Sequence, residues 1–294
     1  MAPSLSFFQG IELVMAKLYY HLRMDFKSYG GYAFFYIVLS LAIDATFPLS
    51  WLDALCRHEM GKKHDIKLTD SGREVMRKQK KIQARTSIVA TVMAIHVSVL
   101  SLYGLLFGPT LDFFSETPLT RHLVNVAVGF FVWDVLFCWN QGIVFLAHGL
   151  ACLAVFLMAL SPYFHGMALV TLLFEASTPF LHARKALIDC DLAKGRLFVF
   201  TEYGFVAVFF LTRIAHGLYA CVVWWLKVEA AIATGDIREW ETPIARMYQS
   251  MCLLLSGLNC YWFFLMARAI IVVKENKSKK FHTEKNPILS QTKK

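Results

Sequence analysis

The residues best placed for chemistry lie together at the end of one apolar run. A carboxylate, two hydroxyls and a proline fall within Leu173–Phe180. A carboxylate in hydrocarbon is costly unless a partner or water satisfies it, so Glu175 marks a candidate functional site. Pro179 lacks an N–H and leaves a carbonyl one turn earlier without its helical donor, which neighbouring helices must satisfy. We therefore expect Glu175, Ser177 and Thr178 to face inward, into a bundle or cavity.

Other ionisable and polar residues fall deep in further apolar runs, and each of them needs a partner at bilayer depth. They are Asp44, His96, Asp134, His148, Glu202, Arg213, His216, Asn259 and, nearer to one membrane surface, Arg268. We expect Arg213 and Asn259 to join Glu175 as polar residues of a cavity, because opposite charges in hydrocarbon pair with one another. Single histidines such as His96 and His216 are interpreted as hydrogen-bonded packing residues.

Asp134 and His148 form the most suggestive pair, on consecutive helices joined by a short turn at Asn140-Gln141-Gly142. At a rise of about 1.5 Å per residue, both lie roughly 9–10 Å from that turn and so at similar depth. A carboxylate beside an imidazole can orient it and raise its basicity, as in general acid–base catalysis. A buried hydrogen bond that locks two helices explains the same spacing, and both interpretations stay open.

Several other chemistries have no motif in the chain. The sequence holds no HxxxH, HxxE or clustered Cys/His pattern, no P-loop, no GxGxxG and no GxSxG elbow. We therefore expect no metal and no cofactor. The seven cysteines form no CxxC pair and are interpreted as buried small hydrophobes. Cys56, expected beside a membrane surface, is also a candidate for palmitoylation.

The composition is that of a membrane protein. The chain has 294 residues, of which 57% are hydrophobic and 17% charged, with a mean hydropathy of +0.49. Soluble domains have roughly 45–50% apolar and about 25% charged residues. The net charge of +9 is concentrated in a few connecting segments, as expected for charges that set membrane topology. We therefore expect membrane lipids as partners and no nucleic acid.

Seven apolar runs approach the roughly 20 residues that a spanning helix needs. They are Tyr29–Leu52, Thr86–Phe107, His122–Cys138, Gly142–Leu160, Gly166–Phe180, Phe198–Trp225 and Met251–Val273. The fold class is therefore all-α and polytopic. Residues 1–28 have apolar positions at helical spacing and are expected to form an interfacial amphipathic helix. Residues 29–84 hold the first spanning helix and a basic loop, and residues 274–294 form a basic tail.

The charges of the connecting segments predict an orientation. Segment 56–85 carries ten basic residues against four acids, and the tail 274–294 carries seven against two. Segments 108–121 and 227–248, on the opposite side, together carry four basic residues against six acids. Basic residues retard translocation, so the first group is expected in the cytosol. Seven spans then place the N-terminus in the lumen and the C-terminus in the cytosol.

Six short stretches, in order along the chain, resemble the TLC domain family, which includes ceramide synthases, translocation-associated membrane proteins and smaller TLC domain-containing proteins. They are Arg85-Thr86-Ser87 with Ser101–Leu105, Gly129–Asp134, Ala147-His148, Glu175–Phe180, Phe209–Ile214 and Leu258–Phe263. Glu175–Phe180 is the most specific of them. The resemblance covers residues 85–273 and is closest to the smaller TLC domain-containing proteins.

The resemblance implies a six-helix TLC bundle around a central cavity, with the first spanning helix as an addition, and work on lipids at the endoplasmic reticulum. Ceramide synthases carry adjacent histidines that handle the acyl group, and here the pair is reduced to His148 followed by Gly149. The nearest histidine of the first core helix, His96, lies almost one turn later than expected at Met93. These departures weaken the case for acyl-CoA-dependent N-acyltransfer.

Three functions follow from these residues. In the first, the chain binds lipid or acyl chains without catalysis and influences membrane lipid composition or homeostasis. In the second, it is a lipid N-acyltransferase with His148 as base or nucleophile and Asp134 as its orienting group. In the third, it is a transporter whose embedded charges line a pathway. Acyl-CoA enters only as a substrate of the second. An enzyme requires His148 exposed to a cavity, whereas a packing histidine is enclosed.

The predicted orientation can be tested with one glycosylation acceptor. Asn276-Lys277-Ser278 matches the N-x-S pattern, and the charges place it in the cytosol, where it is expected to stay unmodified. The measurement is the electrophoretic mass of the protein from cells before and after endoglycosidase treatment. An endoglycosidase-sensitive shift that disappears in Asn276→Gln would reverse the orientation.

Overall fold

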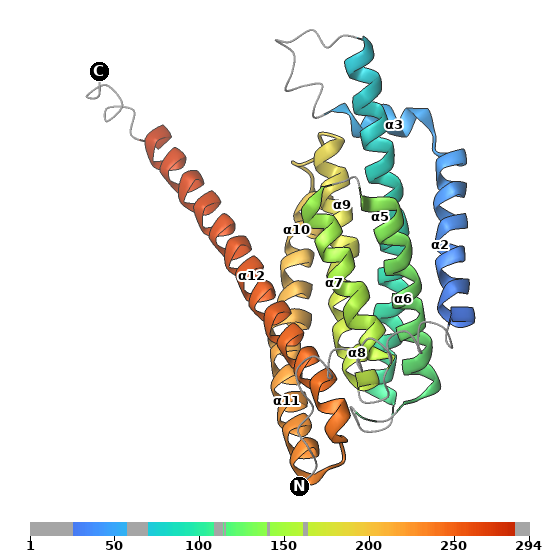
Figure 1. Cartoon of the computed structure of the whole chain (residues 1–294). Coiled ribbons are helices and arrows are strands. Elements are labelled where there is room, and N and C mark those ends of the chain that lie inside the picture. Colours follow the sequence, from blue (N-terminus) through green and yellow to red (C-terminus); the bar gives the residue numbers. More distant parts are fainter. Residues whose placement is uncertain are drawn as a thin grey trace.

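The structure is a computed structural model that describes residues 26–57, 70–108, 114, 116–139, 142–160 and 164–285. Nearly all of these residues are helical, as the all-α prediction requires (Figure 1). The interfacial helix predicted before residue 26, the turn at Asn140-Gln141 and the end of the tail lie outside the described residues.

The helices follow the predicted apolar runs closely enough to identify each one. They are α2 (Phe26–Thr46), α3 (Leu49–Leu55), α5 (Asp70–Phe107), α6 (Pro118–Cys138), α7 (Ile143–Ala159), α8 (His165–Leu173), η3 (Phe174–Ser177), α9 (Thr178–Asp189), α10 (Arg196–Phe209), η4 (Phe210–His216), α11 (Gly217–Thr234), η5 (Glu239–Glu241) and α12 (Thr242–Lys285). The element η3 is a 3₁₀ turn and η4 a π-helical stretch.

Five helical stretches in the described residues are long and apolar enough to cross a membrane. They are Lys27–Thr46, Ser71–Phe107, Pro118–Phe137, Arg196–Thr234 and Thr242–Ala269. Two of the seven predicted spans do not form helices of that length. The apolar part of α7 is the shorter stretch Leu146–Ala159, and the span predicted as Gly166–Phe180 is divided among α8, η3 and α9. The chain is therefore an all-α polytopic membrane protein.

Three predicted boundaries were wrong, for local reasons. The first span was expected to reach Leu52, but α2 ends at Thr46 because Pro48 disfavours helix at the residue before it. The span with Pro179 does not end at Phe180, since a proline in the first turn of a helix is tolerated and α9 continues to Asp189. The loop 227–248 is shortened by α11 and α12, which leave residues 235–241 between them.

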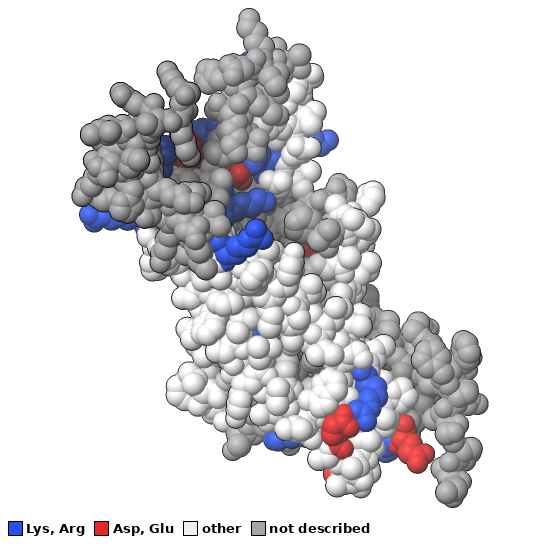
Figure 2. All heavy atoms as spheres, turned by 90° about the vertical axis from the view of Figure 1, so that its left-hand side faces the viewer, with Lys and Arg blue, Asp and Glu red and all other residues white. Residues whose placement is uncertain are grey.

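The charged side chains gather at the two ends of the bundle and leave an uncharged band between them on the face that Figure 2 shows. We call the end where α5 begins and α9 ends the basic end. There Lys80 of α5 forms an ion pair with Asp189 of α9 at 2.7 Å, and Arg77 forms one with Asp53 of α3 at 2.8 Å. Cys56 is 1% exposed, so the thiol considered for palmitoylation is buried.

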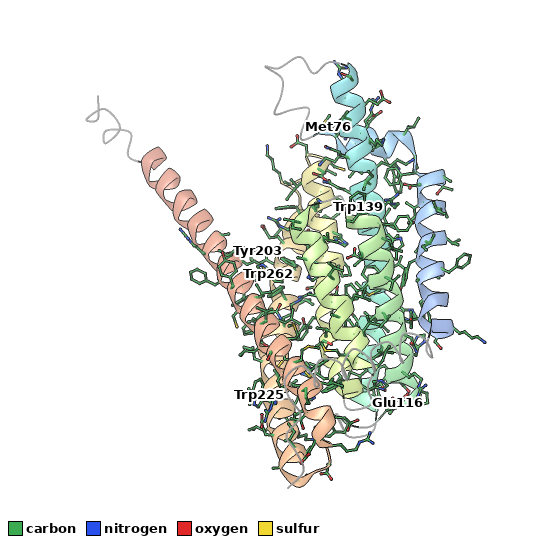
Figure 3. The ribbon with its side chains drawn as sticks, viewed as in Figure 1. Met76, Glu116, Trp139, Tyr203, Trp225 and Trp262 are labelled. Carbon is green, nitrogen blue, oxygen red and sulfur yellow. The ribbon has the colours of Figure 1, made fainter. Side chains whose placement is uncertain are left out.

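Aromatic side chains lie toward both ends of the uncharged band, as the interfacial belts of a membrane protein do. Trp139, at the end of α6, lies toward the basic end, and Trp225 of α11 lies toward the opposite end, as does Glu116 (Figure 3). The Trp139 side chain is 64% exposed. Tyr203 of α10 and Trp262 of α12 lie between these two levels, so aromatic side chains occur along the band as well as toward its ends (Figure 3).

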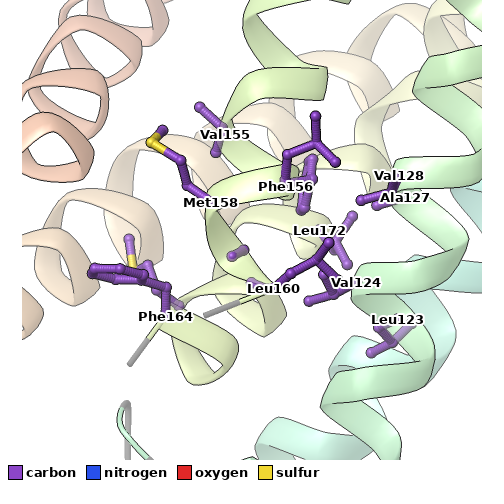
Figure 4. Packing of buried hydrophobic residues seen from close by; sticks show 14 of the residues in the cluster. Leu123, Val124, Ala127, Val128, Val155, Phe156, Met158, Leu160, Phe164 and Leu172 are labelled. Atoms are coloured by element: carbon purple, nitrogen blue, oxygen red, sulfur yellow. The ribbon is translucent and has the colours of Figure 1, made fainter. Parts of the chain in front are cut away.

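The apolar core fills the part of the bundle farther from the basic end. Side chains from α6, α7 and α8 interdigitate there, among them Leu123, Val124, Ala127, Val128, Val155, Phe156, Met158, Leu160, Phe164 and Leu172 (Figure 4). Phe164 stacks on Tyr248 of α12 with ring centroids 4.5 Å apart. This core holds α12 to the bundle at the helix's first turns.

The additional helix α2 packs closely against α6. A Cβ atom on Gly129 would lie 2.5 Å from Cβ of Tyr32, 2.7 Å from the carbonyl oxygen of Tyr29 and 2.8 Å from the backbone nitrogen of Ala33. Only glycine permits this approach of the two backbones, a common solution where helices associate in lipid. The Tyr36 ring packs edge-on against Phe130 at 5.4 Å. Helix α2 is therefore fixed to the bundle.

Gly129→Ala is expected to destabilise the protein by about 1–3 kcal/mol, because the added methyl overlaps backbone that cannot move aside freely. The matched control is Gly31→Ala on α2, where a Cβ atom meets nothing within 4 Å. The control is expected to be neutral, or stabilising by about 0.5–1 kcal/mol. Thermal melting in detergent micelles measures both. Equal melting of Gly129→Ala and the wild type would contradict the α2–α6 contact.

Candidate functional site

The helix that contains Glu175 changes its hydrogen-bond pattern at that residue. The backbone N–H of Thr178 donates to the carbonyl oxygen of Glu175, one residue nearer than in an α-helix. The carbonyl oxygen of Phe174 is therefore available to side chains. It accepts hydrogen bonds from Oγ of Ser177 at 3.2 Å and from Nε of Arg213 at 3.1 Å. The break predicted from Pro179 is thus stabilised by a cation from another helix.

Arg213 connects three helices. Besides Phe174, its guanidinium donates to Oδ1 of Asn259 on α12 at 3.3 Å and lies 3.7 Å from Oε1 of Glu175. It also lies over the rings of Phe174 and Phe209, with centroids at 5.7 and 5.1 Å. The residue belongs to η4, and π-helical turns occur frequently at functional sites.

Glu175 has a hydroxyl partner and a counter-charge, one of them from its own chain segment and the other from η4. Thr178 donates to its Oε2 at 2.7 Å, and Arg213 supplies the opposite charge. Asn259, also predicted to join Glu175, binds Arg213 instead. The side chains of Glu175 and Arg213 are 23% and 15% exposed. Their opposite charges and hydrogen bonds make the pair tolerable in a low-dielectric interior.

Asp134 and His148 lie at the same depth on adjacent helices, although Asp134 faces a different residue of α7. A Cβ atom on Gly149 would lie 2.8 Å from Oδ2 of Asp134, so the carboxylate packs directly against that glycine. The His148 side chain is exposed, and its Nε2 lies 3.7 Å from Sγ of Cys152, one turn along the same helix. The structure gives no hydrogen bond between Asp134 and His148.

Two residues near these groups were not identified from the sequence. The Cys152 thiol is close enough to Glu175, Asp134 and Arg213 to interact with their charges. His182 lies within electrostatic range of Glu175, and its Nδ1 is 2.9 Å from Oγ1 of Thr91 on α5. Helical spacing could have found both, since Cys152 follows His148 by one turn and His182 follows Glu175 by two turns.

We call Glu175, Ser177, Thr178, Arg213 and Asn259, with Asp134 and Cys152 beside them, the polar cluster. It draws side chains from α6, α7, η3, α9, η4 and α12. Within the described residues, no group of three or more His, Cys, Asp and Glu side chains could hold a metal ion. The cluster therefore offers paired charges and hydroxyls, suited to holding a polar group by hydrogen bonds.

The remaining embedded residues lie outside the polar cluster. Asp44 of α2 forms an ion pair with Arg85 of α5, and Glu202 of α10 forms one with Arg184 of α9 at 3.3 Å. The other three were predicted as packing or surface residues. His96 contacts His122, His216 has a buried Nε2 without a hydrogen-bond partner, and Arg268 is exposed.

The fold and the buried polar groups together define a class: a polytopic helical membrane protein with a charged cluster inside its bundle. The TLC domain family model matches residues 83–268, more than half of the chain. This chain belongs to the TLC domain family, which confirms the resemblance drawn from its motifs. All residues of the polar cluster lie within the match.

Two curated proteins are similar to the chain. The uncharacterized TLC domain-containing protein YPR114W of Saccharomyces cerevisiae is 29% identical over 176 residues, which is 56% of this chain and 53% of that protein. TLC domain-containing protein 4-B of Danio rerio is 26% identical over 205 residues, 65% of this chain and 75% of its own. The chain thus spans about half the length of the yeast relative. No solved structure matches it significantly.

Arg213→Leu is expected to destabilise the protein more than Glu175→Leu. Loss of the guanidinium leaves the Glu175 carboxylate without its counter-charge and Asn259 without its donor, whereas loss of the carboxylate leaves Arg213 bonded to Phe174 and Asn259. Removing one partner of a buried ion pair costs about 3–5 kcal/mol. We expect the arginine variant in that range and the glutamate variant below it.

Thermal melting in lipid nanodiscs measures the difference between the two variants. Arg268→Leu is the control, because that arginine is exposed on α12. If both cluster variants melt like the wild type, Glu175 and Arg213 are solvated and the polar cluster does not hold the bundle together.

Proposed function

We propose that this chain is a multi-pass TLC protein that binds a lipid or an acyl chain without changing it chemically, and so influences membrane lipid composition or homeostasis. The observation that carries this proposal is the contact between Asp134 and Gly149. The carboxylate packs against a residue that has no side chain, at the position where the synthases of this family have their second histidine.

A carboxylate that orients a catalytic imidazole must lie within hydrogen-bond reach of it, roughly 2.6–3.2 Å. At position 149 an imidazole would need the space that Oδ2 of Asp134 occupies, only 2.8 Å from a Cβ atom. The neighbouring His148 projects to the exposed side of α7, and its nearest polar contact is the weak one to Cys152. An imidazole without an orienting carboxylate is a poor general base, which favours binding over catalysis.

The polar cluster suits a binding role. Within it, Glu175 and Arg213 neutralise each other's charge. Glu175 and Arg213 are nevertheless partly accessible, and Thr178 and Asn259 add neutral hydrogen-bonding groups. Ligand sites combine apolar walls with a few polar groups that fix orientation. A lipid headgroup could be held here while its chain lies among apolar side chains. The central cavity predicted from the family stays a prediction.

An acyltransferase is the second candidate, and the exposure of His148 favours it. An imidazole that is open on one side of α7 could take a proton from an amine, with acyl-CoA as the substrate and no cofactor. A transporter is the third candidate, and it has less support, because the embedded charges pair with each other instead of lining an open pathway.

The family and the charges of the connecting segments support a proposal for the cellular location and the orientation of the chain. We infer residence in the endoplasmic reticulum, with the basic end in the cytosol, the N-terminus in the lumen and the C-terminus in the cytosol. The supporting observations are the excess of Lys and Arg at the basic end and the mixed charges at the other.

Lipid profiles of cells that lack the protein, complemented with equal amounts of wild type or variants, test this function. We expect His148→Ala to restore the wild-type profile, because the exposed imidazole contributes little to packing or binding. Arg213→Leu is expected to fail even when the cells are cultured at reduced temperature to recover its level, because the polar cluster is lost. Phospholipid and sphingolipid species measured by mass spectrometry provide the comparison.

The same comparison of lipid profiles would also detect a catalytic function. A His148→Ala protein at full level that leaves one lipid product absent would overturn the binding proposal in favour of the acyltransferase. In that case Asp134→Asn is expected to impair product formation less than His148→Ala, because the imidazole remains in place.

A further inference from the structure

A groove of about 700 Å³ lies between α2, α5 and α6, at the edge of the bundle and apart from the polar cluster. Its walls are Tyr32, Phe35 and Tyr36 of α2, Val92 and His96 of α5, and several residues of α6. Its size is within the roughly 300–1,000 Å³ of pockets that hold one small ligand. Helix α2 ends before residue 83, so this wall is outside the part of the chain that matches the TLC domain.

The groove opens toward the bilayer. Phe35 is 51% exposed and Val92 41%, and Ile95, on the neighbouring turn of α5, is 51% exposed. All three belong to helices that are long and apolar enough to span the membrane. Apolar side chains on such helices face lipid tails, so a membrane lipid can enter the groove sideways without crossing water.

Three side chains form a hydrogen-bonded relay along the groove. The Tyr32 hydroxyl lies 2.8 Å from Nδ1 of His122, and Nε2 of His122 lies 3.1 Å from Nε2 of His96. Either direction of hydrogen bonding is consistent with these atoms, since each imidazole has two tautomers. The free end of the relay at Tyr32 can therefore donate a hydrogen bond to a ligand while the free end at His96 accepts one. A change of tautomer in the two imidazoles exchanges these roles.

Asn125 adds an unsatisfied amide to the same wall. Its side chain is buried, with 5% of the residue exposed, and Oδ1 has no hydrogen-bond partner. A buried amide oxygen without a partner is unfavourable, and rotation about the terminal bond of the side chain presents either the oxygen or the N–H to the groove. A ligand that both donates and accepts hydrogen bonds would satisfy this amide in either orientation.

The charges at the mouth of the groove are balanced. Arg121, which lines the groove, forms an ion pair with Glu116, and Nδ1 of His165 lies 4.0 Å from the same carboxylate. A phosphate headgroup would have to compete with Glu116 for Arg121. An ammonium could only donate hydrogen bonds, and a phosphate mainly accepts them. A hydroxyl does both and carries no charge.

We propose that this groove is a binding site for a membrane lipid whose polar end is an uncharged hydroxyl group. The hydroxyl binds Asn125 and the relay of Tyr32, His122 and His96, and the apolar body lies along Phe35 and Val92. The site depends on α2, and it is independent of the function proposed for the polar cluster, because its lining among the described residues comes from α2, α5 and α6.

Photo-crosslinking in nanodiscs tests the site. The probe is a monoacylglycerol that carries a diazirine and an alkyne in its chain, and the matched probe is a lysophosphatidate with the same chain. Labelled peptides are identified by mass spectrometry. We expect the monoacylglycerol to label peptides of α2, α5 and α6 several-fold more than the lysophosphatidate does. Equal or stronger labelling by the anionic probe would overturn the proposal.

Two variants separate the groove from nonspecific contact with lipid. Gly31→Leu is expected to reduce the groove labelling several-fold, because Gly31 lines the groove and a Cβ atom there meets nothing within 4 Å, so the added side chain extends into groove space. Gly257→Leu on α12 also adds a side chain in open space and is expected to change nothing. Unchanged labelling in Gly31→Leu would show that the lipid does not occupy the groove.

Asn125→Leu tests the recognition of the hydroxyl while keeping the volume of the side chain. A third probe, in which both glycerol hydroxyls are methyl ethers, is compared with the monoacylglycerol. The wild type is expected to prefer the free hydroxyls several-fold, and Asn125→Leu is expected to lose that preference. Equal labelling by the two probes in the wild type would refute the role of the hydroxyl, and a preference that survives in Asn125→Leu would refute the role of Asn125.

Discussion

The arrangement of the helices depends on one cation that is kept inside the bundle. Arg213 binds the Phe174 carbonyl that the 3₁₀ turn releases, the Asn259 amide of α12 and the Glu175 carboxylate. Without Arg213, the Phe174 carbonyl and the Glu175 carboxylate would keep only the hydroxyl groups of Ser177 and Thr178, and without these groups Arg213 would be an unpaired charge. The 3₁₀ turn η3, the π-helical stretch η4 and α12 therefore meet at one set of contacts.

A second constraint acts where α6 meets α7. The Asp134 carboxylate lies against Gly149, and any side chain at that position would displace it. The contact places the tip of the Asp134 side chain beside Gly149 and not beside the His148 ring. The same glycine therefore bears on the packing of α6 against α7 and on the function proposed above.

The sequence predicted the features that depend on local chemistry. Apolar runs predicted the helices, and Pro179 beside Glu175 predicted an irregular helix at that point. It could not predict which long-range partners would meet: Asn259 was expected to join Glu175 in a polar cavity, and the spatial arrangement of η4 and α12 brings it to Arg213 instead. His182 was missed because its proximity to Glu175 depends on α9 continuing past the proline. The end of α2 at Thr46 was missed because Pro48 was read as part of the apolar run.

Helix α2 shows how an addition to a fold can create a site. It is fixed to α6 through Gly129, which brings Tyr32 close enough to His122 for a hydrogen bond. The two histidines of the relay belong to α5 and α6, so the matched domain supplies the polar floor and α2 supplies an aromatic wall. Without α2, His122 would lose its Tyr32 partner, and the buried Asn125 would come closer to lipid tails, where a polar group is costly. Helix α2 thus satisfies one polar residue of α6 and covers another, and the groove lies between the two helices and α5.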